Sequence, residues 1–397
     1  LELSAPYESV LRLEDHGIVR GGPGAGKTTI SVLKALRFAE LRLQPEQSVL
    51  FLSFARASVT RLYEALDDAK RASDVSATAI AVETYHSFFW RVLRSHGYLL
   101  GLPRRLTVLA PPQEAIALSS LRSKAPPRSR MSDEETAQHA IKERQVLEAL
   151  AHEAGSIAFR LFAPYVAHLF GQSERLRKNY GQRYPMIVLD EFQDTDPVQW
   201  QIFERLFLER TPPGKGTGQL FLIGDPKQAI YAFRGADVFA YLTARQRMEA
   251  LAARGHAGLY CLATNWRSSA ELVTVYNRLF GQPIWFPPME DSGPMEIGHK
   301  PVQAPSAERG QAQVVVDTSG RGVLNLMDLN ASESPKLARY RLPALIAAEI
   351  QHLVAGSRIE FGADNARRLG FGDICVLIRS RSEAPLMERE FRRRRIP

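Results

Sequence analysis

Residues 21–28 read Gly21-Gly22-Pro23-Gly24-Ala25-Gly26-Lys27-Thr28 and match the pattern GxxxxGK(S/T). In this pattern the glycines let backbone N–H groups surround phosphate oxygens, the lysine neutralises the β- and γ-phosphates, and the hydroxyl binds Mg²⁺. An apolar segment precedes the stretch and a helix is expected over residues 28–41, which is the context that the pattern requires. The alternative is a glycine turn without nucleotide. The stretch therefore predicts an α/β fold that binds ATP and Mg²⁺.

Length and charge limit the number of domains and the kind of partner that the chain can have. A chain of 397 residues exceeds what one hydrophobic core usually supports, so two or three domains are expected. The net charge of +8 and the pI of about 9.5 favour a polyanionic partner. Many basic proteins bind no nucleic acid, so the charge favours a nucleic-acid partner but does not establish one.

Cysteine usage and hydropathy exclude other classes. Cys261 and Cys375 lie far apart with no CxxC pattern, which argues against a zinc site and against a disulfide framework. No apolar run reaches the ~18 to 20 residues that span a bilayer, and the first residues lack signal-peptide features. We therefore expect a cytoplasmic protein without a membrane partner. Because the sequence starts at Leu1 and stops at Pro397, we also expect a fragment cut at both ends.

Short apolar runs outline the predicted sheet. Strands are expected at residues 48–54, 80–82, 186–189 and 220–223, since each run is mainly apolar, as buried parallel strands are. Helical spacing of apolar residues predicts a helix over 55–69. The first strands and the last strands are separated by a long segment of different composition.

That segment, residues 101–182, has Pro-rich and basic pieces that lead into a charged helical stretch, which predicts an inserted helical subdomain. A mixed strand is expected near 312–316, and a helix over 343–354 and a strand over 374–378 are expected to begin a second α/β unit. The predicted domains are an α/β domain at 1–100 and 183–262, the insert at 101–182, and the second unit at 263–397.

Two acids follow one of the predicted strands. Met186-Ile187-Val188-Leu189 runs into Asp190 and Glu191, which places both carboxylates at a strand end where open α/β sheets bind ligands. Asp190 is predicted to hold Mg²⁺, and Glu191 to orient and deprotonate the water that attacks the γ-phosphate. The alternative is an acidic pair that caps the next helix. The phosphate loop earlier in the chain favours the catalytic interpretation.

Longer strings around these residues resemble a known family. Residues 190–194 (DEFQD), 224–237 (GDPKQAIYAFRGAD) and 265–269 (NWRSS) resemble the second, third and fourth motifs of superfamily 1 helicases of the UvrD/Rep/PcrA and RecB group. Three specific strings in the expected order are very hard to obtain by chance. The resemblance implies a RecA-like first domain with a parallel sheet, followed by the beginning of a second RecA-like domain.

Weaker strings agree with this resemblance. Residues 51–56 (FLSFAR) and 84–88 (TYHSF) are similar to motifs Ia and Ib, and residues 373–381 (DICVLIRSR) resemble a segment of the second motor domain, especially in RecB-like members. Two features depart from the family's pattern. Residues 1–20 contain no glutamine to read adenine, and Ala55 with Arg56 replaces a threonine–asparagine pair, so a charge contact to DNA is expected there.

The resemblance also implies roles for individual side chains. Gln228 is expected to sense the γ-phosphate, Arg267 to reach that phosphate from the second lobe, and Trp266 to stack on adenine. A guanidinium fork suits a phosphate and an indole face suits a purine. Tyr85, Tyr231 and Phe233 are expected to stack on successive bases of single-stranded DNA, with His86 and Arg234 beside them, and the alternative for each ring is a core position.

The predicted site has four parts. The catalytic residues are Glu191, Asp190, Gln228 and Arg267. The nucleotide-binding residues are Gly21, Gly22, Gly24, Ala25, Gly26, Lys27, Thr28, Thr29 and Trp266. The Mg²⁺ ligands are Thr28 and Asp190. The DNA-binding residues are Phe54, Arg56, Tyr85, His86, Tyr231, Phe233 and Arg234.

The predicted function is that of an ATP-dependent DNA helicase or translocase that moves along single-stranded DNA, 3′ to 5′ by resemblance, in repair or recombination. Its expected partners are single-stranded DNA, junctions of duplex and single strand, and subunits of a helicase–nuclease complex. The fragment alone is expected to bind Mg-ATP without unwinding DNA. Two alternatives remain: a DNA-binding scaffold that has lost turnover, and a P-loop ATPase or kinase that acts on a small molecule.

Overall fold

The computed structural model describes most of the chain in two compact units. The described residues are 5–54, 56–70, 79–126, 131–209, 218–285, 297–305, 314–317, 320, 322–327, 335–361 and 365–397. The first unit comprises Leu1–Gly21, Gly26–Leu262 and Glu290–Ile297, and the second comprises Gly22–Ala25, Ala263–Met289 and Gly298–Pro397. Each unit is described by itself below.

A six-stranded parallel sheet forms the centre of the first unit. Its strands are β1 (His16–Gly21), β2 (Val49–Ser53), β3 (Ile80–Thr84), β6 (Met186–Leu189), β7 (Gln219–Gly224) and β8 (Ala257–Leu262). They lie in the order β3-β2-β6-β7-β1-β8, and every pair is parallel. All residues of β2, β6 and β7 are buried. Both faces of this sheet must therefore be covered, which explains the uninterrupted apolar runs in the sequence.

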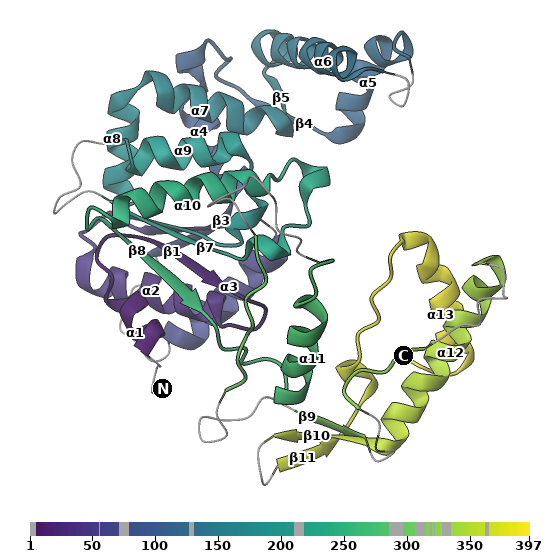
Figure 1. Cartoon of the computed structure of the whole chain (residues 1–397). Helices are drawn as coiled ribbons and strands as arrows, with labels where there is room; N and C mark the ends of the chain where they lie inside the picture. The colour runs from purple at the N-terminus through teal and green to yellow at the C-terminus, as the bar shows by residue number, and fades with distance from the viewer. Residues whose placement is uncertain are drawn as a thin grey trace. The chain divides into compact units, whose positions relative to one another are not determined.

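Helices cover both faces of the sheet (Figure 1). The helices α1 (Ala5–Arg12), α2 (Lys27–Arg42) and α3 (Arg56–Lys70) lie on one face. The helices α4 (Tyr85–His96), α9 (Pro197–Phe207) and α10 (Val238–Ala252) lie on the other. This is the doubly covered parallel sheet that the sequence predicts.

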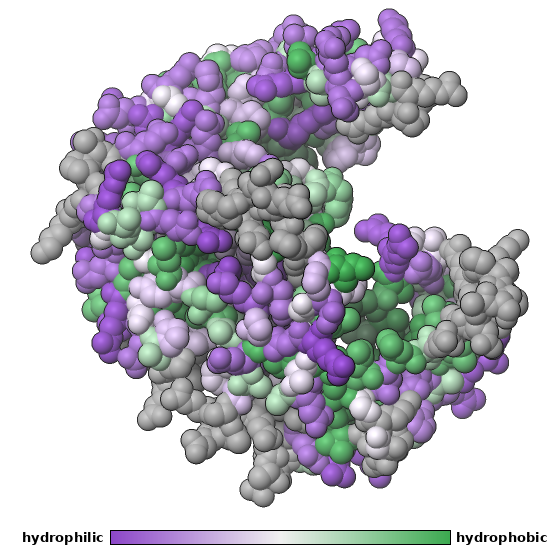
Figure 2. Space-filling view, viewed as in Figure 1, coloured by the Kyte–Doolittle hydropathy of each residue, from purple (hydrophilic) through white to green (hydrophobic). Residues whose placement is uncertain are grey.

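The described part of the predicted insert contains four α-helices and a short strand pair. Its helices are α5 (Pro111–Ser123), α6 (Asp133–Ala154), α7 (Phe162–Gln172) and α8 (Glu174–Arg183). The strands β4 (Thr107–Leu109) and β5 (Ser156–Ala158) pair in parallel, so the segment is not purely helical. Glu143 joins α5 to the residues after β5, since it binds Arg122 at 2.6 Å and Arg160 at 2.9 Å. Figure 2 shows mainly hydrophilic side chains over the outer surface of α5 and α6.

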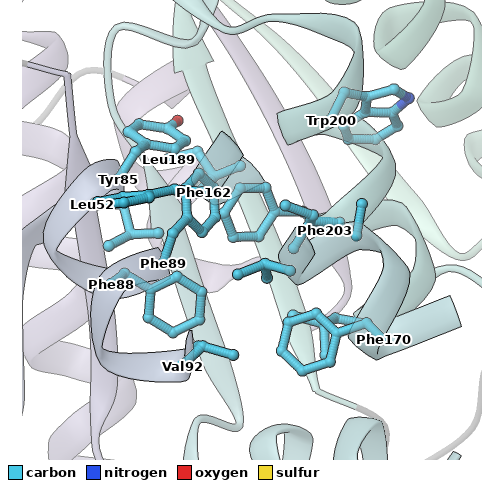
Figure 3. Close-up of a cluster of buried hydrophobic side chains, with 14 of the residues drawn as sticks. Leu52, Tyr85, Phe88, Phe89, Val92, Phe162, Phe170, Leu189, Trp200 and Phe203 are labelled. Carbon is cyan, nitrogen blue, oxygen red and sulfur yellow. The ribbon is translucent and has the colours of Figure 1, made fainter. Parts of the chain in front are cut away.

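The core of the first unit runs continuously from the sheet into the insert. Figure 3 shows rings from α4, α7 and α9 packed together, among them Phe88, Phe162 and Phe203. The rings of Phe88 and Phe203 stack with centroids 6.4 Å apart. The helix α7 thus belongs to the same hydrophobic core as the helices that follow β3 and precede β7.

The second unit combines helices with an antiparallel sheet. Its helices are α11 (Ala270–Phe280), α12 (Pro335–Gly356) and α13 (Ala384–Arg393). The strands β9 (Val314–Asp317), β10 (Ser357–Phe361) and β11 (Asn365–Arg368) pair antiparallel in the order β11-β10-β9. Apolar side chains remain exposed on this unit, including Ile284 and Leu326. The beginning of a second RecA-like domain stays a prediction.

Two predictions for the second unit need correction. Residues 374–378 form no strand and pair with no other described strand, although Ile374 has extended backbone. Ile374 and Val376 instead pack against the small core around Ala347 on α12, while Leu377 is 92% exposed. The helix predicted over 343–354 begins earlier, at Pro335, and contains Pro343 within it. Of the strand predicted near 312–316, residues 312–313 lie outside the described residues.

Within the described part of the chain, no helix is both long enough and apolar enough to cross a membrane.

Candidate functional site

The carboxyl ends of the parallel strands carry the residues that the sequence singles out. Gly21 ends β1, Phe54 follows β2, Asp190 follows β6 and Asp225 follows β7. Because the strands are parallel, these ends meet at one edge of the sheet. Open α/β sheets bind their ligands at this edge.

The helix α2 begins without a side-chain cap. Gly26 precedes the helix in the left-handed conformation with φ 71°, and its carbonyl accepts the Ile30 N–H at 3.0 Å. Since glycine has no side chain, no side-chain cap occupies the first N–H groups of the helix. The Lys27 ammonium is largely buried and donates to the Gly21 carbonyl at 2.9 Å. Thr28 is half-buried and Thr29 is exposed.

Within the second unit, residues 22–25 pack against the segment that contains Trp266 and Arg267. The Trp266 N–H donates to the Gly24 carbonyl at 2.8 Å. A Cβ atom at Gly24 would lie 2.7 Å from the Arg267 Cβ and closer still to Asn265 Oδ1, so this approach requires glycine. Asn265 Oδ1 in turn accepts the Arg267 N–H at 2.9 Å. The structure thus brings three predicted residues of the second unit together, with Trp266 36% exposed.

Asp190 is a buried acid whose surroundings suit a cation. Its side chain is 3% exposed, and no donor among the described residues lies within hydrogen-bond distance of its Oδ1. Burial, and then the charge of Glu191, raise the pKa of Asp190 to about 7. A divalent cation bound here would offset the burial of Asp190 and the charge of Glu191. Its positive charge compensates the carboxylates, and the unpaired Oδ1 of Asp190 would coordinate it. The donor set therefore fits Mg²⁺.

Glu191 has a strained backbone and a fixed carboxylate. Its φ of 50° and ψ of 44° lie in the left-handed region, which residues other than glycine rarely adopt. The carboxylate accepts a hydrogen bond at 2.9 Å from the amide of Gln193, in the short 3₁₀ helix Phe192–Asp194. The opposite end of that amide accepts the Asp225 N–H at 3.0 Å.

The loop after β7 continues this set of contacts. Asp225 Oδ2 accepts a hydrogen bond from Gln228 Nε2 at 2.9 Å. Gln228 is half-buried and ends the 3₁₀ helix Pro226–Gln228. We did not assign roles to Gln193 and Asp225 from the sequence, although both lie in the family-like strings 190–194 and 224–237. In the sequence, these two residues stand out only because they belong to those strings. The hydrogen bonds that they make are visible only in the fold.

Three predicted DNA-binding rings form a contiguous row. The Phe54 and Tyr231 ring centroids lie 5.5 Å apart, and those of Tyr231 and Phe233 lie 5.9 Å apart. Phe233 is 78% exposed, whereas the other two rings are half-buried. We call Phe54, Tyr231 and Phe233 the aromatic row. Its exposed end has the character of a base-stacking surface.

Tyr85 requires a correction. Its ring is 1% exposed and packs edge-on against Phe89 and Phe203 in the core (Figure 3). Its hydroxyl accepts a hydrogen bond from Thr195 at 3.4 Å. A base cannot reach either face of this ring, so the prediction that Tyr85 stacks on DNA is wrong. Tyr85 is a core residue.

His86 lies beside a ring that the sequence interpretation missed. The His86 ring centroid lies 5.9 Å from that of Phe159, which is 42% exposed. Burial lowers the pKa of His86, which favours the neutral imidazole. The only sequence signal for Phe159 was an aromatic residue just ahead of an apolar helix. The side chains of Arg56 and Arg234 lie outside the described part of the structure.

An all-parallel sheet with a glycine-rich loop between β1 and α2, and an acidic pair after β6, defines the P-loop class of α/β proteins. The family model described as the UvrD/REP helicase N-terminal domain matches residues 5–151 and 113–249. These ranges together cover more than half of the 397 residues. The chain therefore belongs to the UvrD/REP helicase family, as the motif strings predict.

Curated relatives match parts of this chain. The RecBCD enzyme subunit RecB of Escherichia coli (strain K12) is 40% identical over 210 residues, which are 51% of this chain and 16% of that protein. RecB of Haemophilus influenzae is 31% identical over 234 residues, which are 56% of this chain and 17% of that protein. RecB of Mycolicibacterium smegmatis is 51% identical over 92 residues, which are 23% of this chain and 7% of that protein. The chain thus spans less than a fifth of the length of these relatives.

Proposed function

We propose that the protein that carries this sequence binds Mg-ATP and couples its hydrolysis to movement along single-stranded DNA, in repair or recombination, while residues 1–397 alone bind Mg-ATP without unwinding DNA. The observation that carries the proposal is the loop after β7. Gln228 is bonded to Asp225 in this loop, and three residues later Tyr231 joins the aromatic row. A single short loop thus contacts Gln193 in the acidic loop after β6 through the Asp225 N–H and also carries a ring of the surface suited to bases.

In the proposed nucleotide site, the backbone of residues 21–28 binds the phosphates and Lys27 neutralises their charge. Thr28 and Asp190 would hold Mg²⁺, which neutralises charge on the β- and γ-phosphates when bound. Glu191 accepts the proton of the attacking water, and Gln228 responds to the γ-phosphate.

Residues of the second unit complete the nucleotide proposal. Arg267 supplies a guanidinium for the γ-phosphate, and the partly exposed indole of Trp266 stacks on adenine. Gly24 fixes the backbone of these two residues relative to the glycine loop through the Trp266 N–H.

The proposed DNA surface consists of the aromatic row together with His86 and Phe159. Stacking on exposed rings is tolerant of sequence, because every base has a π-face. Arg56 and Arg234 are proposed to contact the phosphate backbone of the strand, in line with the net charge of +8.

The names of the relatives suggest partners. The three RecB proteins are named as subunits of a RecBCD enzyme. We propose that the protein with this sequence likewise works with partner subunits of a helicase–nuclease complex, on single strands and on junctions with duplex DNA. We propose movement from 3′ to 5′.

Displacement of streptavidin from biotinylated single-stranded DNA tests the motor and its direction together. The protein that carries this sequence should displace streptavidin from a 5′-biotin in an ATP-dependent manner and leave a 3′-biotin occupied. Lys27→Ala is the control and should displace from neither end. Displacement from the 3′-biotin alone would reverse the direction, and absence of displacement from both ends would contradict the motor.

A further inference from the structure

The side chain of Gln193 joins the acidic loop after β6 to the loop after β7. Its Nε2 donates to Glu191 Oε2 at 2.9 Å, and its Oε1 accepts the Asp225 N–H at 3.0 Å. A carboxylate can only accept and a backbone N–H can only donate, so the two contacts fix the orientation of the amide. The side chain is 2% exposed, so bulk water does not compete for either bond.

Asp225 extends this connection to the side chain of Gln228. Asp225 is 1% exposed, its Oδ2 accepts from Gln228 Nε2 at 2.9 Å, and its Oδ1 accepts the Lys227 N–H at 3.2 Å. A continuous series of contacts therefore leads from the Glu191 carboxylate through Gln193 and Asp225 to Gln228. We call this series the Gln193 bridge.

We propose that Gln193 is a positioning residue that orients the Glu191 carboxylate and makes its orientation depend on the loop that carries Gln228 and the aromatic row. The inference rests on the proposed function, because it takes Glu191 as the general base and the loop after β7 as the DNA-responsive element. Gln193 touches neither nucleotide nor DNA in this scheme and acts through Glu191.

The Gln193 bridge holds a residue, Glu191, whose backbone conformation is unfavourable. A non-glycine residue in the left-handed region costs about 1 to 3 kcal/mol and persists only where its surroundings hold it. Glu191 has this conformation, and Gln193 holds its carboxylate from two residues along the chain. Without the amide, the carboxylate would be free to rotate away from the attacking water.

Gly224 shows how closely the bridge is packed. A Cβ atom at this position would lie 2.6 Å from Gln193 Oε1 and 3.2 Å from the Gln193 backbone nitrogen. The last residue of β7 must therefore be glycine for the Gln193 amide to reach the Asp225 N–H.

Gln193→Met tests the proposal, because it keeps the length of the side chain and removes both the donor and the acceptor. In the protein that carries this sequence, kcat for ATP hydrolysis with single-stranded DNA should fall about 10- to 100-fold, the effect of losing a hydrogen bond to a charged group. KM for ATP should stay unchanged, since the bond acts on the base and not on nucleotide binding. The ratio of turnover with DNA to turnover without DNA should fall as well.

Gln219→Met is the matched control. Gln219 is also buried, at the opposite end of β7, and its amide donates to the Leu13 and Asp15 carbonyls. This variant should melt at a lower temperature and keep kcat and the stimulation ratio per folded protein. If Gln193→Met behaves like Gln219→Met, Gln193 is only structural and the proposal is overturned.

Two further variants keep the test decisive. Gln193→Glu retains the shape and sets a second acceptor against Glu191, so it should lower kcat even if Gln193→Met does not fold. In a Gln228→Ala background, the effect of Gln193→Met on the stimulation ratio should shrink, because both residues act through one series of contacts. Full additivity would contradict the bridge. If the unmodified protein hydrolyses ATP without stimulation by DNA, the proposed function fails, and the role of Gln193 is then decided by the unstimulated kcat.

Discussion

The ring of Phe54, which follows β2, lies 5.5 Å from the ring of Tyr231 in the loop after β7. In the sheet, β2 and β7 are the two neighbours of β6, whose end carries Asp190 and Glu191. The aromatic row therefore joins the strand ends on either side of the acidic pair. In the proposed function, a strand that moves against these rings would act on loops that flank the proposed site of hydrolysis.

Phe233→Ala should weaken binding of single-stranded DNA by about 1 to 3 kcal/mol, the range for a base that loses its aromatic partner. The ring is 78% exposed, so its removal should leave the melting temperature nearly unchanged. Fluorescence anisotropy with a labelled oligonucleotide measures the affinity. Tyr98→Ala removes another exposed ring, 52% exposed and beyond the far end of α4, and serves as the control. Equal affinities of both variants would exclude Phe233 as a stacking surface.

Tyr85→Ala should destabilise the fold by about 3 to 5 kcal/mol, because it leaves a cavity where a large ring packs against Phe89 and Phe203. Tyr85→Phe should cost far less, since it removes only the contact with Thr195. Chemical denaturation measures both values. DNA affinity of folded Tyr85→Phe should equal that of the unmodified protein, and a marked loss would restore Tyr85 as a DNA contact.

Lys27→Ala should abolish ATP turnover and weaken nucleotide binding, because the phosphate charge loses its counter-charge. Glu191→Gln should bind ATP normally and hydrolyse it far more slowly, since an amide cannot accept the proton of water. A fluorescent ATP analogue reports binding, and phosphate release reports turnover. Normal turnover by Glu191→Gln would mean that another residue is the base.

Asp190→Asn should stabilise the protein without nucleotide, and the gain should depend on pH. Burial and the charge of Glu191 raise the pKa of Asp190 to about 7, so between the ordinary value near 4 and this value the folded state holds a proton that the unfolded chain has lost. The stability of the unmodified protein therefore falls as pH rises through this window.

The variant lacks this titration, so its advantage in melting temperature should grow between about pH 4 and about pH 8. The same variant should bind nucleotide less tightly in the presence of Mg²⁺, because a neutral amide is a weaker ligand. An advantage that is equal at both pH values would contradict the raised pKa.

The sequence predicted the sheet and the polar residues at its edge because these depend on local patterns. Met186 to Leu189 is uniformly apolar and leads directly into Asp190, and the strand β6 has these bounds. A buried parallel strand needs apolar residues on both faces, so such strands can be predicted from the sequence alone.

Motif strings alone did not show which side chains face inward. Tyr85 lies within a family-like string, yet Phe88, Phe89 and Val92 follow it at helical spacing and share its buried face. The 3.6-residue period carried that information. By contrast, the Gln193 bridge joins residues 32 positions apart, and no local pattern reports such a contact. Residues 374–378 have a strand-like composition, but a strand also needs a neighbour to pair with.

The most direct test of the coupling between the two surfaces is ATP turnover by the protein that carries this sequence, measured with and without single-stranded DNA at saturating ATP and Mg²⁺. Contacts on the aromatic row should act on Glu191 through the loop after β7, so turnover should rise severalfold when DNA is added, and Phe233→Ala should require more DNA for the same rise. Equal turnover with and without DNA would contradict the proposal that the protein that carries this sequence couples ATP hydrolysis to movement along a strand.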